Sequence, residues 1–558
     1  MLSSYTAGGT GCLVLVDLET GEGESLELPG DSGAWALLPW GEGELLVGTC
    51  SERGYLHRLD LATRSWREPL RDPGETYIWN LCRGSDGMAY GGTWPGGVLL
   101  RYDPVRHVLE NMGKLSDNPE NMYVRRVWGE VPGSIIAAVG EAEAHLAVWS
   151  MATGAARRFG SPGESIVRVT AEYVCVDSPQ GELAYYDTRS FAPMAAPAGA
   201  GPDTEATELE SKLRTTSYYT SRVDRETFLA VRGQEYCVWR PSREERPLYR
   251  LIPTSPPATR ILTVTTDEAG KVWGSCGFGQ TVFSFDPATG ASWNSRAVCD
   301  RGGEVFGMRF IRGRLFMSAY SAGDHVVYDP ARPWNQWDND NPRTLRSVHP
   351  ELIRPTGKSV VGPDGAFWTG WQAAYGVYGG GISRVDPDTL DVTSWYDPVR
   401  EQMIAGLDAD CDRIYFATGG AANGLRNREG PFAFVAWDAQ GRDIARIMLP
   451  RGVTAGQVCA LEAEILVACT DRIVRVDAKS VEPLPPLLAE SGCSCAVRRD
   501  SSSAYLFCGE DLQLFRAGGE LRKIARVPAS VGTAAVAPDG TLYFASGAEL
   551  YALAGIRG

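Results

Sequence analysis

Residues 78–113, IWNLCRGSDGMAYGGTWPGGVLLRYDPVRHVLENMG, decide the fold. They contain four strand-length pieces, IWNLCRG, MAYGGTW, GVLLRYDP and HVLENMG, each bounded by Gly, Asp or Pro turn signals. Asp accepts hydrogen bonds from the backbone ahead of it and Gly takes a positive φ without strain, so the connections are tight reversals. We expect a four-stranded antiparallel unit, with strands A to D in chain order.

The same unit recurs along the chain. Its C strand ends in an Asp followed by a turn, as in LVLVDLETG at Asp17, VFSFDPATG at Asp286 and IVRVDAKS at Asp477. Further copies end at Asp60, Asp103, Asp187, Asp329, Asp386 and Asp438. Successive copies lie about 40–55 residues apart, which is the length of one four-stranded propeller blade. A run of sandwich domains would repeat nearer to about 100 residues.

The number of copies exceeds one ring. About twelve units are present, whereas a single propeller has about four to eight blades. The sequence therefore predicts an all-β protein with two β-propellers of about six or seven four-stranded blades each, over residues 1–255 and 256–558. The first unit lacks a clear A strand and the last lacks a D strand, which would let the chain ends close a shared blade. Residues 194–213 lack a strand pattern and are either a linker or a long loop.

Composition excludes several classes of protein. Of the 558 residues, 44% are hydrophobic and 22% charged, and no apolar run approaches the length of a membrane span, so we expect no membrane segment. The 69 acidic residues exceed the 54 basic ones, giving a net charge of −15. This charge argues against nucleic acid and anionic membranes as partners, except at a local arginine cluster.

The cysteines and the N-terminal residues bear on the compartment. The thirteen cysteines are odd in number and irregularly spaced, which predicts buried thiols in a reducing compartment and not a disulfide framework. Residues 1–17 lack a basic segment followed by an apolar stretch. We therefore predict a cytoplasmic protein, or a secreted one if a leader has been trimmed.

Two kinds of connection are longer than closure of a blade requires. They are the B–C and D–A connections, such as residues 49–55, 93–97, 369–381 and 418–432. Long loops usually carry binding work, so a ligand is expected on their face near an axis. The substrate-binding candidates are the aromatic, guanidinium and amide side chains Tyr77, Trp79, Trp94, Arg126, Arg354, Trp371, Gln372 and Tyr375. The alternative for each aromatic residue is packing between blades.

The catalytic candidates form two sets. His145 and His325 precede or begin C strands at nearly equivalent places, and a histidine there suits general acid or base chemistry. Tyr123 and Arg125 join His145, and Tyr320 and Arg354 join His325. Arginine binds a carboxylate through two parallel hydrogen bonds, so either set would suit a uronic acid and proton abstraction α to its carboxylate. The alternatives are a structural histidine and an arginine paired with an acidic loop residue such as Glu120 or Glu141.

Other chemistries find less support in the sequence. It contains no G-x-S-x-G elbow, no phosphate-binding glycine loop, no H-E-x-x-H and no cysteine pair at zinc spacing. We predict no cofactor. An axial divalent cation of the lactonase type stays open, with Glu52, Glu143, Asp324 and Asn423 as possible ligands.

Several segments resemble a bacterial β-propeller group of largely unassigned function. They are GGTWPGGVLLRYDP (91–104), NMYVRRV (121–127), EAHLAVW (143–149), YDPARPWNQWDNDNPR (328–343) and TGWQAAYGVYGGGISRVDP (369–387). The resemblance covers about residues 75–160 and 305–425. NQWDNDNPR departs from the W-N-P-G string usual in that group.

This group is similar to propeller polysaccharide lyases and glycosidases that act on rhamnose–glucuronate and related uronic linkages. Those enzymes use Arg, Tyr and His at a propeller face, and the resemblance implies these roles for Arg125, Tyr123 and His145. The sequence therefore predicts a carbohydrate-active enzyme that cleaves a uronic-acid linkage by β-elimination, with an oligosaccharide or polysaccharide as substrate. The alternatives are a non-catalytic propeller that binds sugar or protein, and a metal-dependent lactonase.

Overall fold

The computed structural model describes all residues except 1, 5, 199, 201–207, 210, 214–218, 245, 300–301, 489–491 and 556–558. Part of the predicted linker at 194–213 thus lies outside the described residues. The chain divides into two compact units. Unit 1 comprises residues 1–204, 253–257 and 424–426, and unit 2 comprises 205–252, 258–423 and 427–558. The predicted division at residues 255 and 256 stays a prediction.

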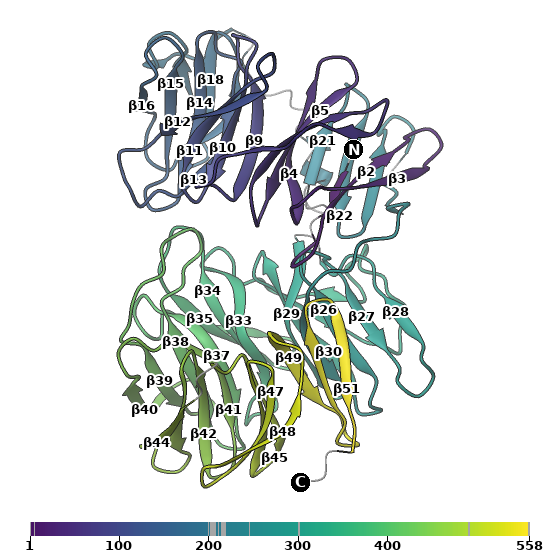
Figure 1. The fold of residues 1–558 in the computed structure, drawn as a ribbon, viewed down its shortest axis with the longest axis vertical. Helices are drawn as coiled ribbons and strands as arrows, with labels where there is room; N and C mark the ends of the chain where they lie inside the picture. The colour runs from purple at the N-terminus through teal and green to yellow at the C-terminus, as the bar shows by residue number, and fades with distance from the viewer. Residues whose placement is uncertain are drawn as a thin grey trace. The chain divides into compact units, whose positions relative to one another are not determined.

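Unit 1 consists of antiparallel sheets in chain order (Figure 1). The first contains β1 (Leu2–Ser4), β2 (Cys12–Val16) and β3 (Gly23–Glu27). The second contains β4 (Gly33–Trp40), β5 (Glu44–Cys50), β6 (Tyr55–Asp60), β7 (Ser65–Trp66) and β8 (Leu70–Arg71). The next blade contains β9 (Tyr77–Arg83), β10 (Ala89–Trp94), β11 (Val98–Asp103) and β12 (Val108–Lys114), and the pair Cys50–Tyr77 joins it to the second in one nine-stranded sheet. The last two contain β13 (Tyr123–Trp128), β14 (Ser134–Gly140), β15 (His145–Ser150) and β16 (Ala156–Phe159), then β17 (Ser165–Val169), β18 (Tyr173–Asp177), β19 (Leu183–Asp187) and β20 (Pro193–Met194).

Unit 2 begins with four sheets of the same kind. They are β21 (Tyr219–Arg222), β22 (Phe228–Arg232), β23 (Glu235–Trp239) and β24 (Arg250–Leu251); β25 (Ile261–Thr266), β26 (Val272–Cys276), β27 (Val282–Phe285) and β28 (Ser292–Asn294); β29 (Gly302–Ile311), β30 (Arg314–Ser321), β31 (Asp324–Tyr328) and β32 (Arg343–Thr344); and β33 (Leu352–Val361), β34 (Phe367–Ala373), β35 (Gly380–Val385) and β36 (Val392–Tyr396).

Four further sheets complete unit 2. They are β37 (Met403–Ala409), β38 (Ile414–Gly419), β39 (Ala433–Trp437) and β40 (Asp443–Met448); β41 (Ala455–Ala460), β42 (Glu464–Cys469), β43 (Arg472–Asp477) and β44 (Pro483–Leu488); β45 (Cys495–Asp500), β46 (Ser503–Cys508), β47 (Asp511–Arg516) and β48 (Glu520–Arg526); and the three strands β49 (Val531–Val536), β50 (Leu542–Ser546) and β51 (Glu549–Leu553).

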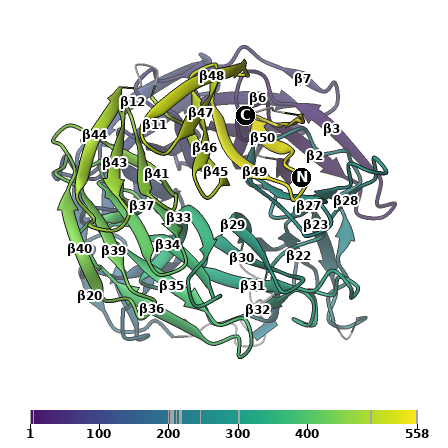
Figure 2. The same cartoon turned by 90° about the horizontal axis from the view of Figure 1, so that it is seen from below.

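The sheets from β25 to β51 form a seven-bladed ring. The A strands β25, β29, β33, β37, β41, β45 and β49 each contact the next, and β49 contacts β25, so the ring closes. Figure 2 shows β29, β33, β37, β45 and β49 around the centre of this unit. The predicted all-β propeller fold is confirmed. The two chain ends contribute to separate sheets, since β1 pairs with β2 and β51 pairs with β50.

Burial follows the position of a strand in its blade. The C strand β15 is buried at its four central residues because neighbouring blades cover both of its faces. The D strand β40 alternates between exposed and half-buried residues because it lies at the outer edge. Apolar clusters therefore lie between blades, as where Trp368 and Ile382 of one blade pack with Leu407 and Phe416 of the next.

The repeated Asp caps the C–D turn as the sequence predicts. Oδ1 of Asp103 accepts hydrogen bonds from the backbone N–H groups of Val105 and Arg106, at 2.9 and 3.0 Å. These bonds hold the pKa of Asp103 below its usual value. Asp60, Asp187, Asp386 and Asp477 repeat the arrangement.

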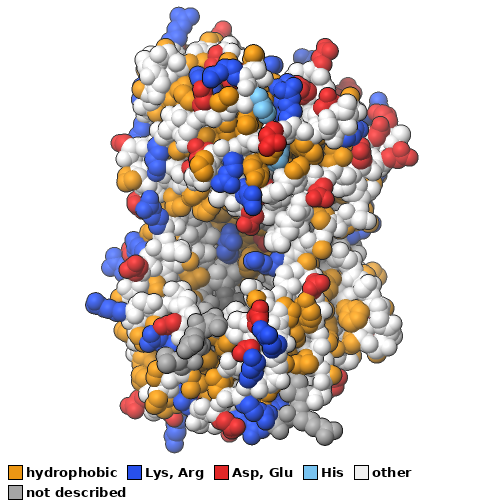
Figure 3. Space-filling model, viewed as in Figure 1, with side chains coloured by type: hydrophobic (Ala, Val, Ile, Leu, Met, Phe, Trp, Pro, Cys, Tyr) orange, Lys and Arg blue, Asp and Glu red, His pale blue; other side chains and the backbone are white. Residues whose placement is uncertain are grey.

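Two properties predicted from composition can be compared with the structure. None of the thirteen cysteines is in a disulfide, and nine of them are buried. No helix among the described residues is both long and apolar enough to cross a membrane. On the face drawn in Figure 3, basic and acidic side chains are interspersed.

Candidate functional site

One residue is bulged out of register near the start of the A strand in three neighbouring blades of unit 1. The pairing of β4, β9 and β13 skips Trp35, Trp79 and Arg125 respectively. A bulge adds an unpaired residue and redirects its side chain. The ring centroids of Trp35 and Trp79 lie 5.0 Å apart, and the guanidinium carbon of Arg125 lies 5.4 Å from the Trp79 ring. The bulged side chains therefore converge along the inner strands.

Three further rings complete what we call the inner aromatic cluster: Trp35, Tyr77, Trp79, Trp94, Tyr123 and Arg125. Tyr77 stacks on Trp79 with centroids 4.7 Å apart, and Trp94 meets the Tyr77 ring edge-on at 5.3 Å. The Tyr123 ring centroid lies 5.7 Å from that of Trp79 and 6.2 Å from that of Trp94. The structure thus brings together four of the predicted substrate-binding and catalytic aromatic residues and Arg125.

The charge of Arg125 is compensated inside the protein. Its Nε donates to a carboxylate oxygen of Glu141, and its guanidinium also lies 4.5 Å from the Tyr123 ring centroid. This is the ion pair that the sequence leaves open as the structural alternative for Arg125. Arg126 is exposed and follows the bulge in normal register opposite Ala138.

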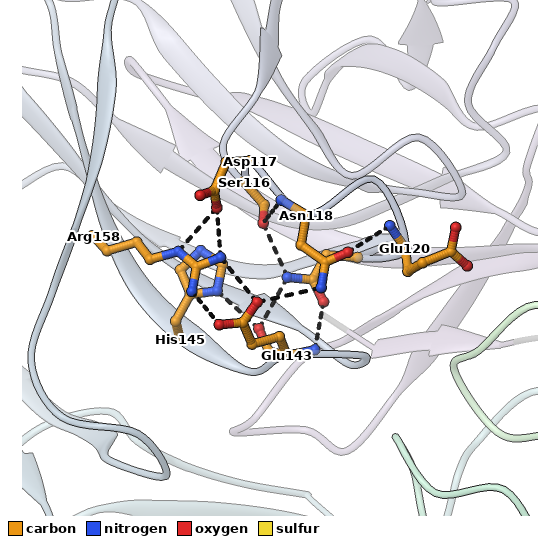
Figure 4. Close-up of polar contacts among 8 residues, drawn as sticks. Ser116, Asp117, Asn118, Glu120, Glu143, His145 and Arg158 are labelled. Carbon is orange, nitrogen blue, oxygen red and sulfur yellow. Dashed lines mark hydrogen bonds and ion pairs between the residues drawn. The ribbon is translucent and has the colours of Figure 1, made fainter.

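His145 belongs to a different network (Figure 4). Its Nδ1 lies 2.8 Å from the carbonyl oxygen of Glu143, whose carboxylate accepts hydrogen bonds from Arg158 at 2.5 Å and Asn118 at 3.3 Å. Arg158 also donates to Asp117. The Arg158 guanidinium holds the pKa of Glu143 at about 2.

The contacts of His145 thus lead to Glu143 and Arg158, whereas those of Tyr123 and Arg125 lead to Trp79 and Glu141. The Nε2 atom of His145 is buried and lacks a hydrogen-bond partner within the described structure. The bond to a neighbouring carbonyl is the structural role that the sequence leaves open for this histidine. The triad that the resemblance implies is therefore divided between two contact networks.

His325 lies in the interior of unit 2. Its side chain is 1% exposed, with Nε2 2.8 Å from the Ser383 hydroxyl and Nδ1 3.2 Å from the Arg346 carbonyl. Burial lowers the pKa of His325 to about 4. Both ring nitrogens are hydrogen-bonded and the ring does not reach solvent; the catalytic role of His325 stays a prediction.

The other two members of that predicted set do meet, together with a third residue. The hydroxyls of Tyr320, at the end of β30, and Tyr375, in the loop after β34, are 2.8 Å apart. The guanidinium carbon of Arg354, on β33, lies 4.0 Å from the Tyr320 ring centroid. We call Tyr320, Arg354 and Tyr375 the tyrosine–arginine cluster. All three side chains are half-buried, so they combine a fixed position with access for a ligand.

A hydrogen bond to Asn423 orients the Arg354 side chain. Its Nε donates to Oδ1 of Asn423 at 3.0 Å, and Asn423 in turn donates to the Ala373 carbonyl. Burial acts to lower the pKa of Arg354, but the oxygens of Tyr320, Tyr375 and Glu304 outweigh it, so the pKa lies above its usual value. Glu304 is buried, and burial raises the pKa of its carboxyl.

Two predicted substrate-binding residues lie beneath this cluster. Trp371 has no exposed surface, and its Nε1 donates to the Ser383 hydroxyl at 2.7 Å. Packing against Val348 and Leu352 covers its ring, and contact of Trp371 with substrate stays a prediction. Gln372 is 5% exposed and pairs in register with Arg354 across β33 and β34.

Trp35 is the site residue that sequence reasoning missed. It is 38% exposed and occupies the third position of its A strand, as Trp79 and Arg125 do in theirs. Alignment of the A strands GAWA, YIWN and YVRR could have found it. Within the described residues, no group of three His, Cys, Asp or Glu side chains could hold a metal ion.

Comparisons with known proteins found similar solved structures but no match by sequence. No protein-family model and no curated protein matches the sequence. Similar solved structures include a streptogramin B lyase (12% identity, 53% of this chain and 94% of that chain, TM-score 0.42). A Kuenenia stuttgartiensis hydrazine synthase is similar over 54% of this chain and 97% of that one (12% identity, TM-score 0.42). The extracellular domain of BT4673 from B. thetaiotaomicron is similar over 99% of this chain and 82% of that one (12% identity, TM-score 0.29).

Proposed function

We propose that this propeller protein is a carbohydrate-active lyase that cleaves a uronic-acid linkage at the tyrosine–arginine cluster. The observation that carries the proposal is the pair of hydrogen-bonded hydroxyls of Tyr320 and Tyr375, with the Arg354 guanidinium packed on the first ring. Elimination next to a carboxylate needs a cation for the carboxylate, a base and an acid. The three side chains supply one group of each kind.

In the proposed reaction, Arg354 binds the uronate carboxylate and stabilises the negative charge that develops on it. Tyr320, acting as the base in its phenolate form, removes the proton α to the carboxylate. The electron pair of the broken C–H bond forms a C=C bond, and the bond from the β-carbon to the glycosidic oxygen breaks. Tyr375 donates its proton to that leaving oxygen. The products are a free hydroxyl and an unsaturated uronate, so no external oxidant is needed.

The test uses glucuronate- and galacturonate-containing oligosaccharides and follows the ultraviolet absorbance of the unsaturated product. We expect Tyr320→Phe and Arg354→Gln to reduce kcat by about 100-fold or more, as loss of an acid–base or charge-stabilising group does. Tyr396→Phe is the matched control, because Tyr396 is 48% exposed and lies outside the cluster. Absence of product across the panel would overturn the lyase proposal.

A second candidate is sugar binding without chemistry at the inner aromatic cluster. It is favoured by the stacked rings of Tyr77 and Trp79 and by the compensated charge of Arg125, which suit contact with the apolar face of a sugar better than acid–base work. Trp35→Ala should then weaken binding of oligosaccharides measured by calorimetry. Trp293→Ala, which removes a tryptophan of similar exposure in unit 2, should not.

A further inference from the structure

A concave site lies in unit 2, apart from the tyrosine–arginine cluster. It is a cavity of about 240 Å³ between the sheet β21–β24 and the segment after β31. We call it the arginine–tryptophan pocket. It is lined by Arg232, Glu235, Arg246, Pro247, Leu248, Tyr249, Arg296, Trp334, Asn335, Gln336 and Trp337. Residues 335 to 337 belong to the string NQWDNDNPR, in which the sequence departs from the resembling propeller group.

The floor of the pocket is a buried arginine with one unmet donor. The Arg232 side chain is 6% exposed. Its Nη1 donates to Gln336 Oε1 at 2.8 Å and its Nη2 to Glu235 Oε2 at 3.1 Å. Its Nε is buried and has no hydrogen-bond partner among the described residues. Buried donors are nearly always paired, by protein, water or ligand.

Aromatic rings hold this guanidinium in place. Its carbon lies 4.7 Å from the Tyr249 ring centroid and 5.0 Å from that of Trp337, and the two rings are 5.3 Å apart. Cation–π contacts of this kind strengthen where water is excluded. The side chain is therefore preorganised, and its binding geometry does not depend on the arrival of a ligand.

The charges around the pocket do not cancel. Glu235, at 1% exposure, lies between Arg232 and Arg296, whose Nη1 is 2.9 Å from Glu235 Oε1. Nη1 of Arg246 lies 3.6 Å from Oδ1 of Asp338, with which it forms an ion pair. Three guanidinium groups face two carboxylates, which leaves one positive charge. The side chains of Arg296 and Arg246 are 55% and 63% exposed, so they lie at the mouth and can turn toward a ligand.

We propose that the arginine–tryptophan pocket binds a small hydroxylated carboxylate of about the size of one sugar acid. One excess positive charge matches a single carboxylate, for which guanidinium offers paired donors. The volume corresponds to the share of roughly eight liquid water molecules and is below that of pockets for drug-sized ligands. The amide side chains of Asn335 and Gln336 suit hydroxyl groups. This site does not depend on the proposed lyase reaction.

The test is calorimetric titration of the full chain with D-glucuronate, and with D-glucose as the neutral probe of the same size. We expect glucuronate to bind at least about tenfold more tightly than glucose, since charged hydrogen bonds contribute about 1.5–3 kcal/mol. Arg296→Gln and Arg246→Gln should each weaken glucuronate binding about tenfold on the same basis. Both residues are at the mouth, so the fold should survive.

Arg243→Gln is the matched control. Arg243 is exposed, lies three residues before Arg246 and does not line the cavity, so its loss removes the same charge outside the pocket. Equal weakening by this variant would reduce the effect to general surface charge and overturn the proposal. No binding of glucuronate, or equal binding of glucose, would overturn it as well. Loss of glucuronate binding in Arg296→Gln reports on this pocket, whereas loss of unsaturated product in Tyr320→Phe reports on the proposed lyase site, so the two proposals can fail separately.

Discussion

Acid should destabilise the blade around His57 because this residue must be neutral in the folded protein. Its side chain has no exposed surface, and neither ring nitrogen has a hydrogen-bond partner in the described part of the chain. Its ring lies 5.4 Å from Tyr55 and 5.3 Å from Trp66. Burial lowers the pKa of His57 to about 4, against a partly opposing effect of Asp31.

The sign and size of the effect follow from linkage. The folded pKa lies below the unfolded value of about 6.5, so between these values the unfolded state binds more protons. Stability is therefore retained above pH 6.5 and is lost as the pH falls toward 4. At pH 5, about 1.5 units below the unfolded pKa, the loss is about 2 kcal/mol at 1.36 kcal/mol per unit.

His57→Phe removes the titrating group and keeps a ring, and no hydrogen bond to a described residue is lost. We expect the variant to lose about 2 kcal/mol less stability than the wild type between pH 7.5 and pH 5. Amide hydrogen exchange of peptides covering β5 and β6, corrected for intrinsic rates, measures this opening free energy. If the variant and the wild type decline equally over that range, the reasoning is wrong.

Three further outcomes are expected. His325→Phe should lower the free energy of unfolding by about 1–3 kcal/mol already at pH 7.5, because Ser383 and the Arg346 carbonyl each lose a hydrogen bond. In this it differs from His57→Phe. Equal urea midpoints for the variant and the wild type would contradict this prediction. Asp31→Ala should cost about 3 kcal/mol or more by the same assay, since its carboxylate accepts bonds from the Thr49 hydroxyl and four backbone N–H groups. Treatment with a chelator should leave the melting temperature unchanged, and a clear decrease would reveal a bound metal ion.

The candidate sites were only partly visible in the sequence. Tyr320 and Arg354 were identified because each lies on a long connection or at the start of an A strand, and Tyr375 because its loop is longer than closure requires. Their convergence is a tertiary fact, as the hydroxyls that meet are 55 residues apart in the chain. Trp35 was missed because it lies in a short connection-to-strand segment without a neighbouring motif.

The position of Arg125 relative to His145 illustrates a second limit of pattern reasoning. Strand alternation predicts which face a side chain takes, but one bulge at Arg125 changes that phase within its strand. A bulge leaves no mark in composition or spacing. The contacts of Arg125 with Glu141 and of His145 with the Glu143 carbonyl could therefore be assigned only from coordinates.

The amino-acid order alone determined the blade. Alternating apolar residues and the Asp turn act over fewer than ten neighbours, so the hairpin geometry is local and repeats wherever the pattern repeats. Tertiary structure alone decided which side chains share a cavity, which histidines are sealed, and that Arg232 meets Gln336 from 104 residues away. These contacts depend on the packing of one blade on another, because residues distant in the chain determine how buried each side chain is and which charges surround it.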